Sequence, residues 1–310
     1  MKCEGLNWRW TKCDFMRQSA ACIACGSDDM ERIANVPDAN AGTGRTYDYN
    51  RCRACGTTTL AQLLTPEQLQ RIYPDDFYSY LPQVPASKLS GALNRMVYNR
   101  HRFRPQFGRM LEIGSGRGDF IASLNAQNNA VGLERSEAAR RAGKDIGVDV
   151  VVGNVEDADL FEPDAFDYIY LNHAFEHLNE PHAALHSMYK WLKPGGRMFI
   201  GVPNIRGAAP RIFSKFWYHF AAPLHVTLYT SSGITALLER NGFVIERIDF
   251  NSDPLSFPIS LFIAAGRYPV HMTRSEKLLM RALSVPVLPL SKALDKLGLG
   301  DCIEVHARRR

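Results

Sequence analysis

The segment "RMLEIGSGRGDF", residues 109–120, decides the fold of this chain. A short apolar run ends at Ile113 and leads into glycines at positions 114, 116 and 118, after which apolar residues resume. This order predicts a buried strand, a sharp loop whose backbone can come close to a ligand, and the start of a helix. The dinucleotide-binding fingerprint needs Gly or Ala at position 119, where this chain has Asp119. The loop alone therefore leaves the identity of the ligand open.

Predicted strands and helices alternate downstream of this loop. Further strands are expected in "AVGLERS" (130–136), "VDVVVGNVED" (148–157), "FDYIYLNHAFEHL" (166–178) and "LKPGGRMFIGVPN" (192–204), with helices at 119–127, 136–146 and 180–192. This alternation predicts an α/β fold with a doubly wound, mostly parallel sheet. Ligands of such a sheet collect at the carboxyl ends of its strands, where this chain keeps its polar residues.

Two later segments complete a seven-stranded sheet. We expect "GFVIERIDF" (242–250) and "DCIEVHARRR" (301–310) to pair, with an apolar insertion at 251–300 between them. Residues 256–310 carry nine Lys and Arg against four Asp and Glu. Because an apolar face with basic flanks can rest on an anionic bilayer, peripheral membrane contact through 256–300 is one interpretation. A substrate wall and a dimer interface are the alternatives, and the sequence leaves the oligomeric state open.

Taken together and in this order, the motifs of residues 109–250 resemble those of class I S-adenosylmethionine-dependent methyltransferases. The resemblance implies a Rossmann-like catalytic domain over residues 108–310 and S-adenosylmethionine as the cofactor. Many members of the class have Asp where this chain has Asn154, and an amide oxygen can still accept a hydrogen bond from the adenine amine.

The resemblance also assigns cofactor-binding roles by position. It implies that Glu112, Gly114 and Gly116 cradle the methionine part of the cofactor. It further implies that Glu134, at the end of the second strand, holds the ribose hydroxyls. The residues expected around the adenine and over the cofactor are Asn154, Val155, Glu156 and Asn172.

The string "HAFEH" at 173–177 matches the H-x-x-E-H spacing of a class of zinc peptidases. A peptidase site needs His173 and His177 on one regular helix together with a third ligand, whereas the predicted strand runs up to His173. We therefore expect His173 at the end of the fourth strand, as a wall of the cofactor site or as a catalytic group. His177 is expected to anchor the following helix.

Proton removal from an acceptor calls for a base near neutral pKa, for which His is the usual side chain. The segment 223–243, "PLHVTLYTSSGITALLERNGF", resembles a form that recurs in bacterial methyltransferases of polysaccharide and deoxysugar pathways. The resemblance places His225 in the active site, so we expect His225 as the base, with His173 as the second candidate. A structural role for His225, capping the loop before a helix at 231–241, is the alternative.

Four cysteines form two knuckles near the N-terminus, "CIAC" (Cys22, Cys25) and "CRAC" (Cys52, Cys55). Two such knuckles predict a closed tetrahedral site of four sulfurs, the arrangement that structural Zn²⁺ prefers. We expect a small zinc-ribbon domain over residues 18–60. Cys3, Cys13 and Cys302 have no partners by spacing and are interpreted as ordinary thiols.

Residues 61–107 join the two parts. The stretch 64–83 is rich in aromatic residues, and 88–104 predicts an amphipathic, basic helix. Such a segment is expected to form a lid over the cofactor or a linker that packs between the domains. Aromatic rings would suit stacking on a sugar face, whereas the basic residues fit a solvated helix face.

The composition is that of a folded protein with a packed core. The 310 residues are 45% hydrophobic, carry a net charge of +5 and have a pI of about 8.8. The first residues lack the continuous apolar core of a signal peptide, so we expect a cytoplasmic enzyme, with contact at the inner membrane face left open. The preferred function is O-methylation of a sugar or glycan, small or lipid-linked, in bacterial polysaccharide or secondary-metabolite biosynthesis. The alternatives are an rRNA or tRNA base methyltransferase, for which scattered basic residues make nucleic acid a poor partner, and a quinone-type O-methyltransferase.

Overall fold

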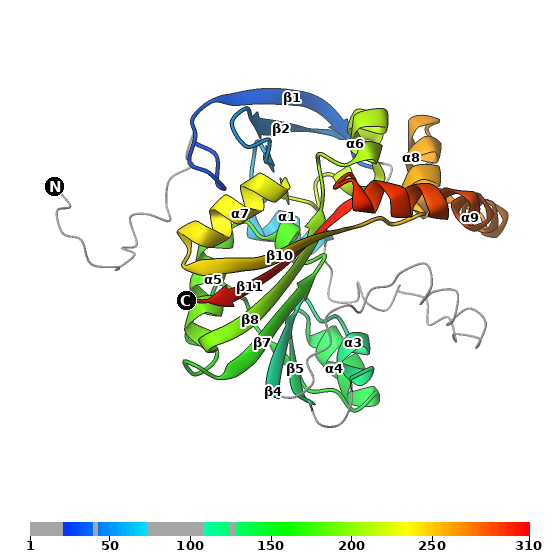
Figure 1. Cartoon of the computed structure of the whole chain (residues 1–310). Coiled ribbons are helices and arrows are strands. Elements are labelled where there is room, and N and C mark those ends of the chain that lie inside the picture. The colour runs from blue at the N-terminus through cyan, green and yellow to red at the C-terminus, as the bar shows by residue number, and fades with distance from the viewer. Residues whose placement is uncertain (1–20, 40–42, 73–107, 125–127) are drawn as a thin grey trace.

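The computed structural model describes residues 21–39, 43–72, 108–124 and 128–310. Seven strands form one sheet in the order β10-β11-β8-β7-β4-β5-β6 (Figure 1). The strands are β4 (Gly108–Ile113), β5 (Asn128–Glu134), β6 (Val150–Val152), β7 (Phe166–Asn172), β8 (Leu192–Pro203), β10 (Phe243–Asn251) and β11 (Cys302–Arg309). Only β11 is antiparallel to its neighbours, β8 and β10. The expected seven-stranded, mostly parallel α/β sheet is confirmed.

Helices cover both faces of this sheet, as the alternating sequence pattern predicts. On one side lie α3 (Asp119–Ala122) and α4 (Glu137–Asp145), and on the other α5 (Pro181–Trp191) and α7 (Ser231–Arg240) (Figure 1). Successive residues of a strand point to opposite faces. Within β7, Ile169 and Leu171 therefore join the core beneath α5 and α7, whereas Tyr170 joins the core beneath α3.

The insertion between β10 and β11 is helical. It contains α8 (Ser256–Ala264), a short 3₁₀ turn (Pro269–His271) and α9 (Arg274–Lys296). Helix α9 begins with a capping box, in which the Thr273 hydroxyl accepts from the backbone of Glu276 and the Glu276 carboxylate accepts from the backbone of Thr273. The helix extends away from the large sheet as an arm (Figure 1).

A second, smaller sheet carries the cysteine knuckles. Its order is β1-β2-β3-β9, formed by β1 (Met30–Pro37), β2 (Thr46–Cys52), β3 (Thr58–Leu60) and β9 (Thr227–Leu228). The last of these strands comes from the loop between β8 and α7, so the ribbon and the catalytic part share one sheet. Of the expected lid, α1 (Pro66–Ile72) is described, and the predicted basic helix at 88–104 lies outside the described residues.

Candidate active site

The glycine loop packs closely against the chain that follows β7 and against the end of β5. Gly114, Gly116 and Gly118 have φ angles of 72°, 55° and 85°, in the left-handed region that favours glycine. A Cβ on Gly114 would come within 2.6 Å of the Cβ of Ala174, so a side chain there would force the chain after β7 to move. The backbone N–H of Gly116 donates to Glu134 at 3.1 Å, which joins the loop to the end of β5.

Glu112, on β4 just before this loop, has a buried carboxyl group. Its side chain is 8% exposed, and its Oε2 has no hydrogen-bond partner among the described residues. Burial, followed by the nearby carboxylates of Asp119 and Glu134, raises the pKa of Glu112 to about 8. A buried carboxyl group with an unused oxygen fits a ligand that brings a positive charge, such as the ammonium group of a methionine moiety. The residues present therefore fit the expected cofactor.

Other predicted cofactor residues lie along the same carboxyl edge of the sheet. Asn154, Val155 and Glu156 follow β6 directly, and Val155 is buried. The backbone N–H of Gly153 donates to the carbonyl of Glu134 at 2.9 Å, which places this turn beside the end of β5. Asn172 is the last residue of β7.

The "HAFEH" string does not lie on a regular α-helix. His173 has a φ of 53°, and a short 3₁₀ helix, Phe175–His177, follows it. The Nδ1 of His177 donates to the carbonyl of Leu224 at 2.8 Å, since a carbonyl can only accept. His177 therefore anchors the loop that carries His225, instead of the helix that begins at Pro181. This geometry lacks the helical spacing of a zinc-peptidase site.

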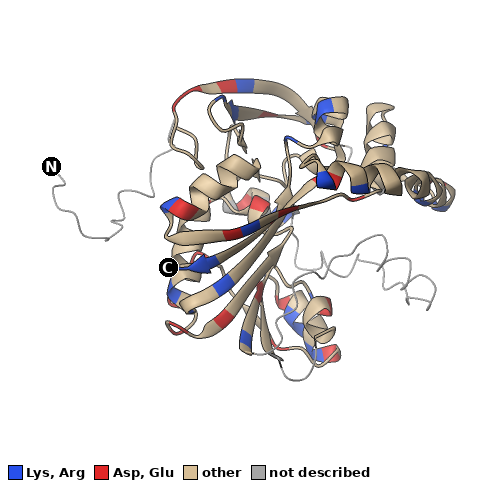
Figure 2. Cartoon of the chain, viewed as in Figure 1, with Lys and Arg blue, Asp and Glu red and all other residues tan. Residues whose placement is uncertain are grey.

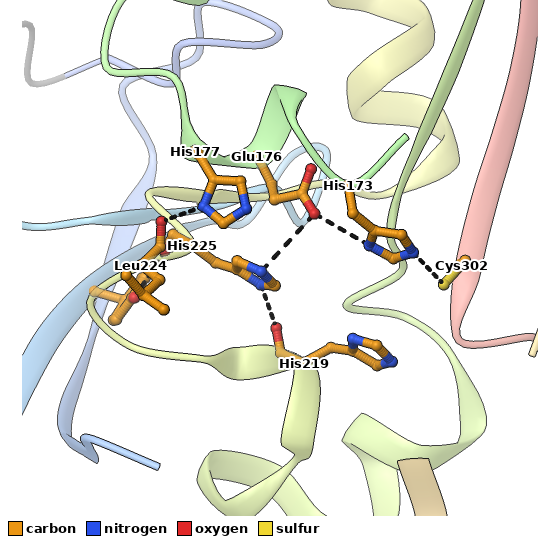
Figure 3. Close-up of polar contacts among 8 residues, drawn as sticks. His173, Glu176, His177, His219, Leu224, His225 and Cys302 are labelled. Carbon is orange, nitrogen blue, oxygen red and sulfur yellow. Dashed lines mark hydrogen bonds and ion pairs between the residues drawn. The ribbon is translucent and has the colours of Figure 1, made fainter. Parts of the chain in front are cut away.

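A fully buried carboxylate, Glu176, lies at the centre of the site (Figure 3). Its Oε1 lies 3.2 Å from Nδ1 of His173 and 3.8 Å from Nε2 of His225. Burial by itself raises the pKa of Glu176, but the hydrogen bond from His173 and the electrostatic influence of the nearby histidine rings lower it to about 2. Glu176 is therefore an anion at neutral pH.

His225 is held from both sides. Its Nδ1 donates to the carbonyl of His219 at 2.7 Å, and its own carbonyl accepts from the hydroxyl of Tyr49 at 2.9 Å. Burial, followed by the charge of His177, lowers the pKa of His225 to about 3. The imidazole of His225 is therefore neutral at physiological pH, with Nε2 as its unprotonated nitrogen.

Three residues of this cluster were not singled out by sequence reasoning. Glu176 stood inside the quoted string, His219 precedes the quoted segment 223–243, and Cys302 was interpreted as an ordinary thiol. The Sγ of Cys302 lies 3.7 Å from Nε2 of His173, and burial raises the pKa of this thiol. The rings of His173 and His219 are nearly parallel, with centroids 5.8 Å apart. Only the density of histidines in "FWYHFAAPLH" could have pointed to His219.

The four cysteines converge as the spacing predicts. Cys22 lies 3.6 Å from Cys55, and Cys25 lies 3.6 Å from Cys52, measured between sulfurs. All four sulfurs lie within 4.8 Å of one another. Ligands about 2.3 Å from a tetrahedral Zn²⁺ are roughly 3.8 Å apart, so this spacing fits zinc and is far longer than the ~2 Å of a disulfide.

The ribbon is bonded directly to the catalytic part. The hydroxyl of Thr230 donates to the carbonyl of Cys55 at 2.7 Å, and Arg240 donates to the carbonyl of Ala24 at 3.2 Å. The Nε2 of His182 lies 2.9 Å from the carbonyl of Ile23. The knuckles therefore pack on α5 and α7, and through β9 they adjoin the loop of His225.

Comparisons with known proteins agree with this architecture. A family model for a methyltransferase domain matches residues 85–248. A ubiquinone biosynthesis O-methyltransferase of Xanthomonas axonopodis pv. citri (strain 306) is 33% identical over 135 residues, 41% of this chain and 56% of that protein. The chain thus matches little more than half the length of this relative. The solved structure of the [4+2]-cyclase SpnF aligns with a TM-score of 0.50 at 16% identity, covering 79% of this chain and 96% of the other.

The family match and the sheet order establish the class of protein. The chain belongs to the methyltransferase-domain family and has the Rossmann-like fold of class I methyltransferases. The resemblance in the catalytic motifs is thereby confirmed, whereas the sugar acceptor and the occupancy of the cysteine site stay predictions.

Glu112 gives the cofactor site a pH dependence. With a pKa of about 8, this carboxyl group is mostly protonated at pH 7 before the cofactor binds. Because the cofactor's ammonium group favours the anion, we expect binding to release a proton and the affinity to rise several-fold from pH 6 to pH 7.5. Calorimetry in buffers of different ionisation enthalpy measures the number of protons released when the cofactor binds. Glu112→Gln should bind more weakly with no such pH dependence, and proton-neutral binding to the native chain would contradict the assignment.

The cysteine site can be tested by metal analysis. Replacing both Cys22 and Cys52 by Ser should release about one zinc ion per chain. It should also lower the free energy of unfolding by several kcal/mol, because structural zinc contributes directly to folding. Mass spectrometry of the metal content and thermal unfolding measure the two effects. Cys302→Ser, a change outside the ribbon, is the matched control. An unchanged zinc content in the double variant would show that the ribbon cysteines do not hold zinc.

Proposed function

We propose that this methyltransferase transfers a methyl group to a hydroxyl of a sugar or glycan, with structural Zn²⁺ in the ribbon. The observation that carries the chemistry is the pairing of His173 with the buried Glu176 at the carboxyl end of β7. Glu112, Gly114, Gly116, Glu134, Asn172 and the turn 154–156 would hold the cofactor. When bound, S-adenosylmethionine supplies an electrophilic methyl group.

The protein's task is to align the acceptor hydroxyl and to take its proton. The ionised Glu176 can only accept, so Nδ1 of His173 donates to it, and Nε2, which lies 3.7 Å from the Cys302 sulfur, carries the lone pair that can receive a proton. The carboxylate then stabilises the imidazolium that forms, as in other carboxylate–histidine pairs. The side chain of His173 is 34% exposed, so an acceptor can reach it.

His225, the base preferred from the sequence, takes a different role in this proposal. Its side chain is 10% exposed, and its Nε2 faces Glu176 instead of open space. We therefore assign proton removal to His173, the second candidate, and assign His225 to positioning its own loop through the hydrogen bond from Nδ1 to the His219 carbonyl.

Variant kinetics can distinguish the roles of His173 and His225. His173→Ala should lower kcat by roughly 10²–10⁴-fold, the usual contribution of a general base, while the cofactor Kd changes little. Added imidazole should restore part of the rate, because it can replace the lost ring. His186→Ala, at an exposed position of α5, is the control and should keep full activity. A His173→Ala enzyme with most of its turnover would return the proton-accepting role to His225.

The acceptor class rests on the resemblance of residues 223–243 to sugar-pathway enzymes. The Xanthomonas relatives, named for ubiquinone biosynthesis, make a quinol hydroxyl the second candidate. Nucleic acid is disfavoured because Lys and Arg alternate with Asp and Glu along the described elements (Figure 2). Transfer of labelled methyl into host lysate distinguishes these classes. Label in sugar or lipid-glycan fractions supports the proposal, label in the quinone fraction supports the second candidate, and nuclease-sensitive label contradicts both.

Helix α9 supports a lipid-linked acceptor. No helix among the described residues is long and apolar enough to cross a bilayer. The arm nevertheless exposes a series of apolar side chains, Leu278, Leu279, Leu283, Val285 and Leu290, all at least 39% exposed. Basic residues on the same helix, Arg274, Lys277 and Arg281, complement anionic lipid headgroups. We propose that this face rests on an anionic membrane surface.

Vesicle binding tests the arm. Replacing both Leu279 and Leu283 by Gln should weaken binding to phosphatidylglycerol vesicles by roughly tenfold or more, since burying each leucine stabilises by 1–2 kcal/mol. The control is Ile146→Gln, an exposed apolar position at the end of α4. Native binding should also be weak on purely zwitterionic vesicles. Equal co-sedimentation of native and double-variant protein would contradict the membrane proposal.

A further inference from the structure

Two histidines each form a hydrogen bond through Nδ1, and this bond fixes the orientation of the ring and the position of its Nε2 atom. His177 donates through Nδ1 to Leu224, and His225 donates through Nδ1 to His219, in both cases to backbone carbonyls that can only accept. In the neutral ring, Nε2 then carries a lone pair. Both rings lie on the same side of Glu176, with centroids 4.8 Å apart (Figure 3). Metal-binding histidines are commonly oriented by this kind of backbone contact.

The carboxylate beside these two rings has an unused oxygen. Glu176 is fully buried, and its Oε2 has no hydrogen-bond partner among the described residues. Leaving a buried charged oxygen without a partner costs several kcal/mol, so a counter-charge is expected beside it. His173 already uses Oε1, and Nε2 of His225 lies 3.8 Å from the same oxygen. Two nitrogen lone pairs and a carboxylate oxygen thus lie within 4.8 Å of one another.

We propose that Glu176, His177 and His225 form a second metal site, which binds a divalent transition cation of the zinc class. One ligand atom from each of the three residues lies within 4.8 Å of the others. Ligands about 2.0–2.1 Å from a tetrahedral ion are roughly 3.3 Å apart, so a contraction of at most about 1.5 Å brings them into place. Two imidazoles with one carboxylate favour zinc-like ions over Mg²⁺, which prefers oxygen ligands.

The proposed ion explains features that the methyl-transfer proposal leaves unused. It neutralises the buried carboxylate, while Oε1 keeps its hydrogen bond to His173. It also joins the 3₁₀ turn after β7 to the loop of His225, because its ligands come from both segments. The ligand set differs from that of an H-x-x-E-H peptidase, since His225 takes the place of His173. The metal site does not rest on the identity of the acceptor.

Metal analysis of the full chain separates this site from the ribbon. After reconstitution with Zn²⁺ and dialysis against a weak chelator, the native protein should hold about two zinc ions per chain. Glu176→Gln and His177→Ala should each hold about one, and the His186→Ala control should hold two. With Co²⁺ in place of zinc, His177→Ala should lose visible bands from nitrogen and oxygen ligands and keep the thiolate charge-transfer band of the ribbon.

The outcomes decide whether a metal supplies the counter-charge. One zinc ion per native chain, or two in both variants, overturns the proposal and leaves the hydrogen bond from His173 as the compensation of the Glu176 charge. If Glu176→Gln fails to fold by circular dichroism, His177→Ala decides alone, because His177 is only partly buried. Metal content is read without any acceptor, so its result is independent of the labelled-methyl experiment.

Discussion

The buried carboxylate of Glu176 is the constraint on which the catalytic edge depends. A carboxylate removed from water is costly unless hydrogen bonds or opposite charges compensate it. Here Nδ1 of His173, three residues away, contacts the carboxylate, and the backbone N–H of the distant Val226 donates to the backbone carbonyl of the same residue at 2.8 Å. The end of β7 and the loop before β9 are thereby fixed relative to each other.

The ribbon supports this arrangement from outside. Tyr49, on β2, donates to the carbonyl of His225, and β3 pairs with β9 immediately after that histidine. A metal site built from four cysteines would hold these strands in one position. The N-terminal sheet therefore acts on the active-site loop by fixing its backbone, without placing a described side chain in the cluster of Figure 3.

Local patterns predicted the framework well, because they depend on neighbouring residues. The glycines at 114 and 116, the acid at Glu134 and the paired cysteines each follow a spacing that the backbone requires. The cluster around Glu176 could not be predicted in this way. No spacing in "HAFEH" shows that Leu224 accepts from His177, or that Cys302, on the last strand, approaches His173. The role of His225 also differs from the expected one, because its burial makes it a poorer proton acceptor than its sequence context indicated.

The pairing of β3 with β9 has a consequence for biosynthesis. Thr58 pairs with Leu228, so the ribbon's edge strand is translated long after its other three strands. During that interval the edge of β3 and one side of the knuckles have no native partner, and unpaired strand edges favour association with other chains. Early metal capture by the cysteines would keep the nascent N-terminal segment compact until residues 227–240 emerge from the ribosome. A ribbon that holds zinc would therefore make the protein's yield in a cell depend on zinc supply during translation as well as on the stability of the finished fold.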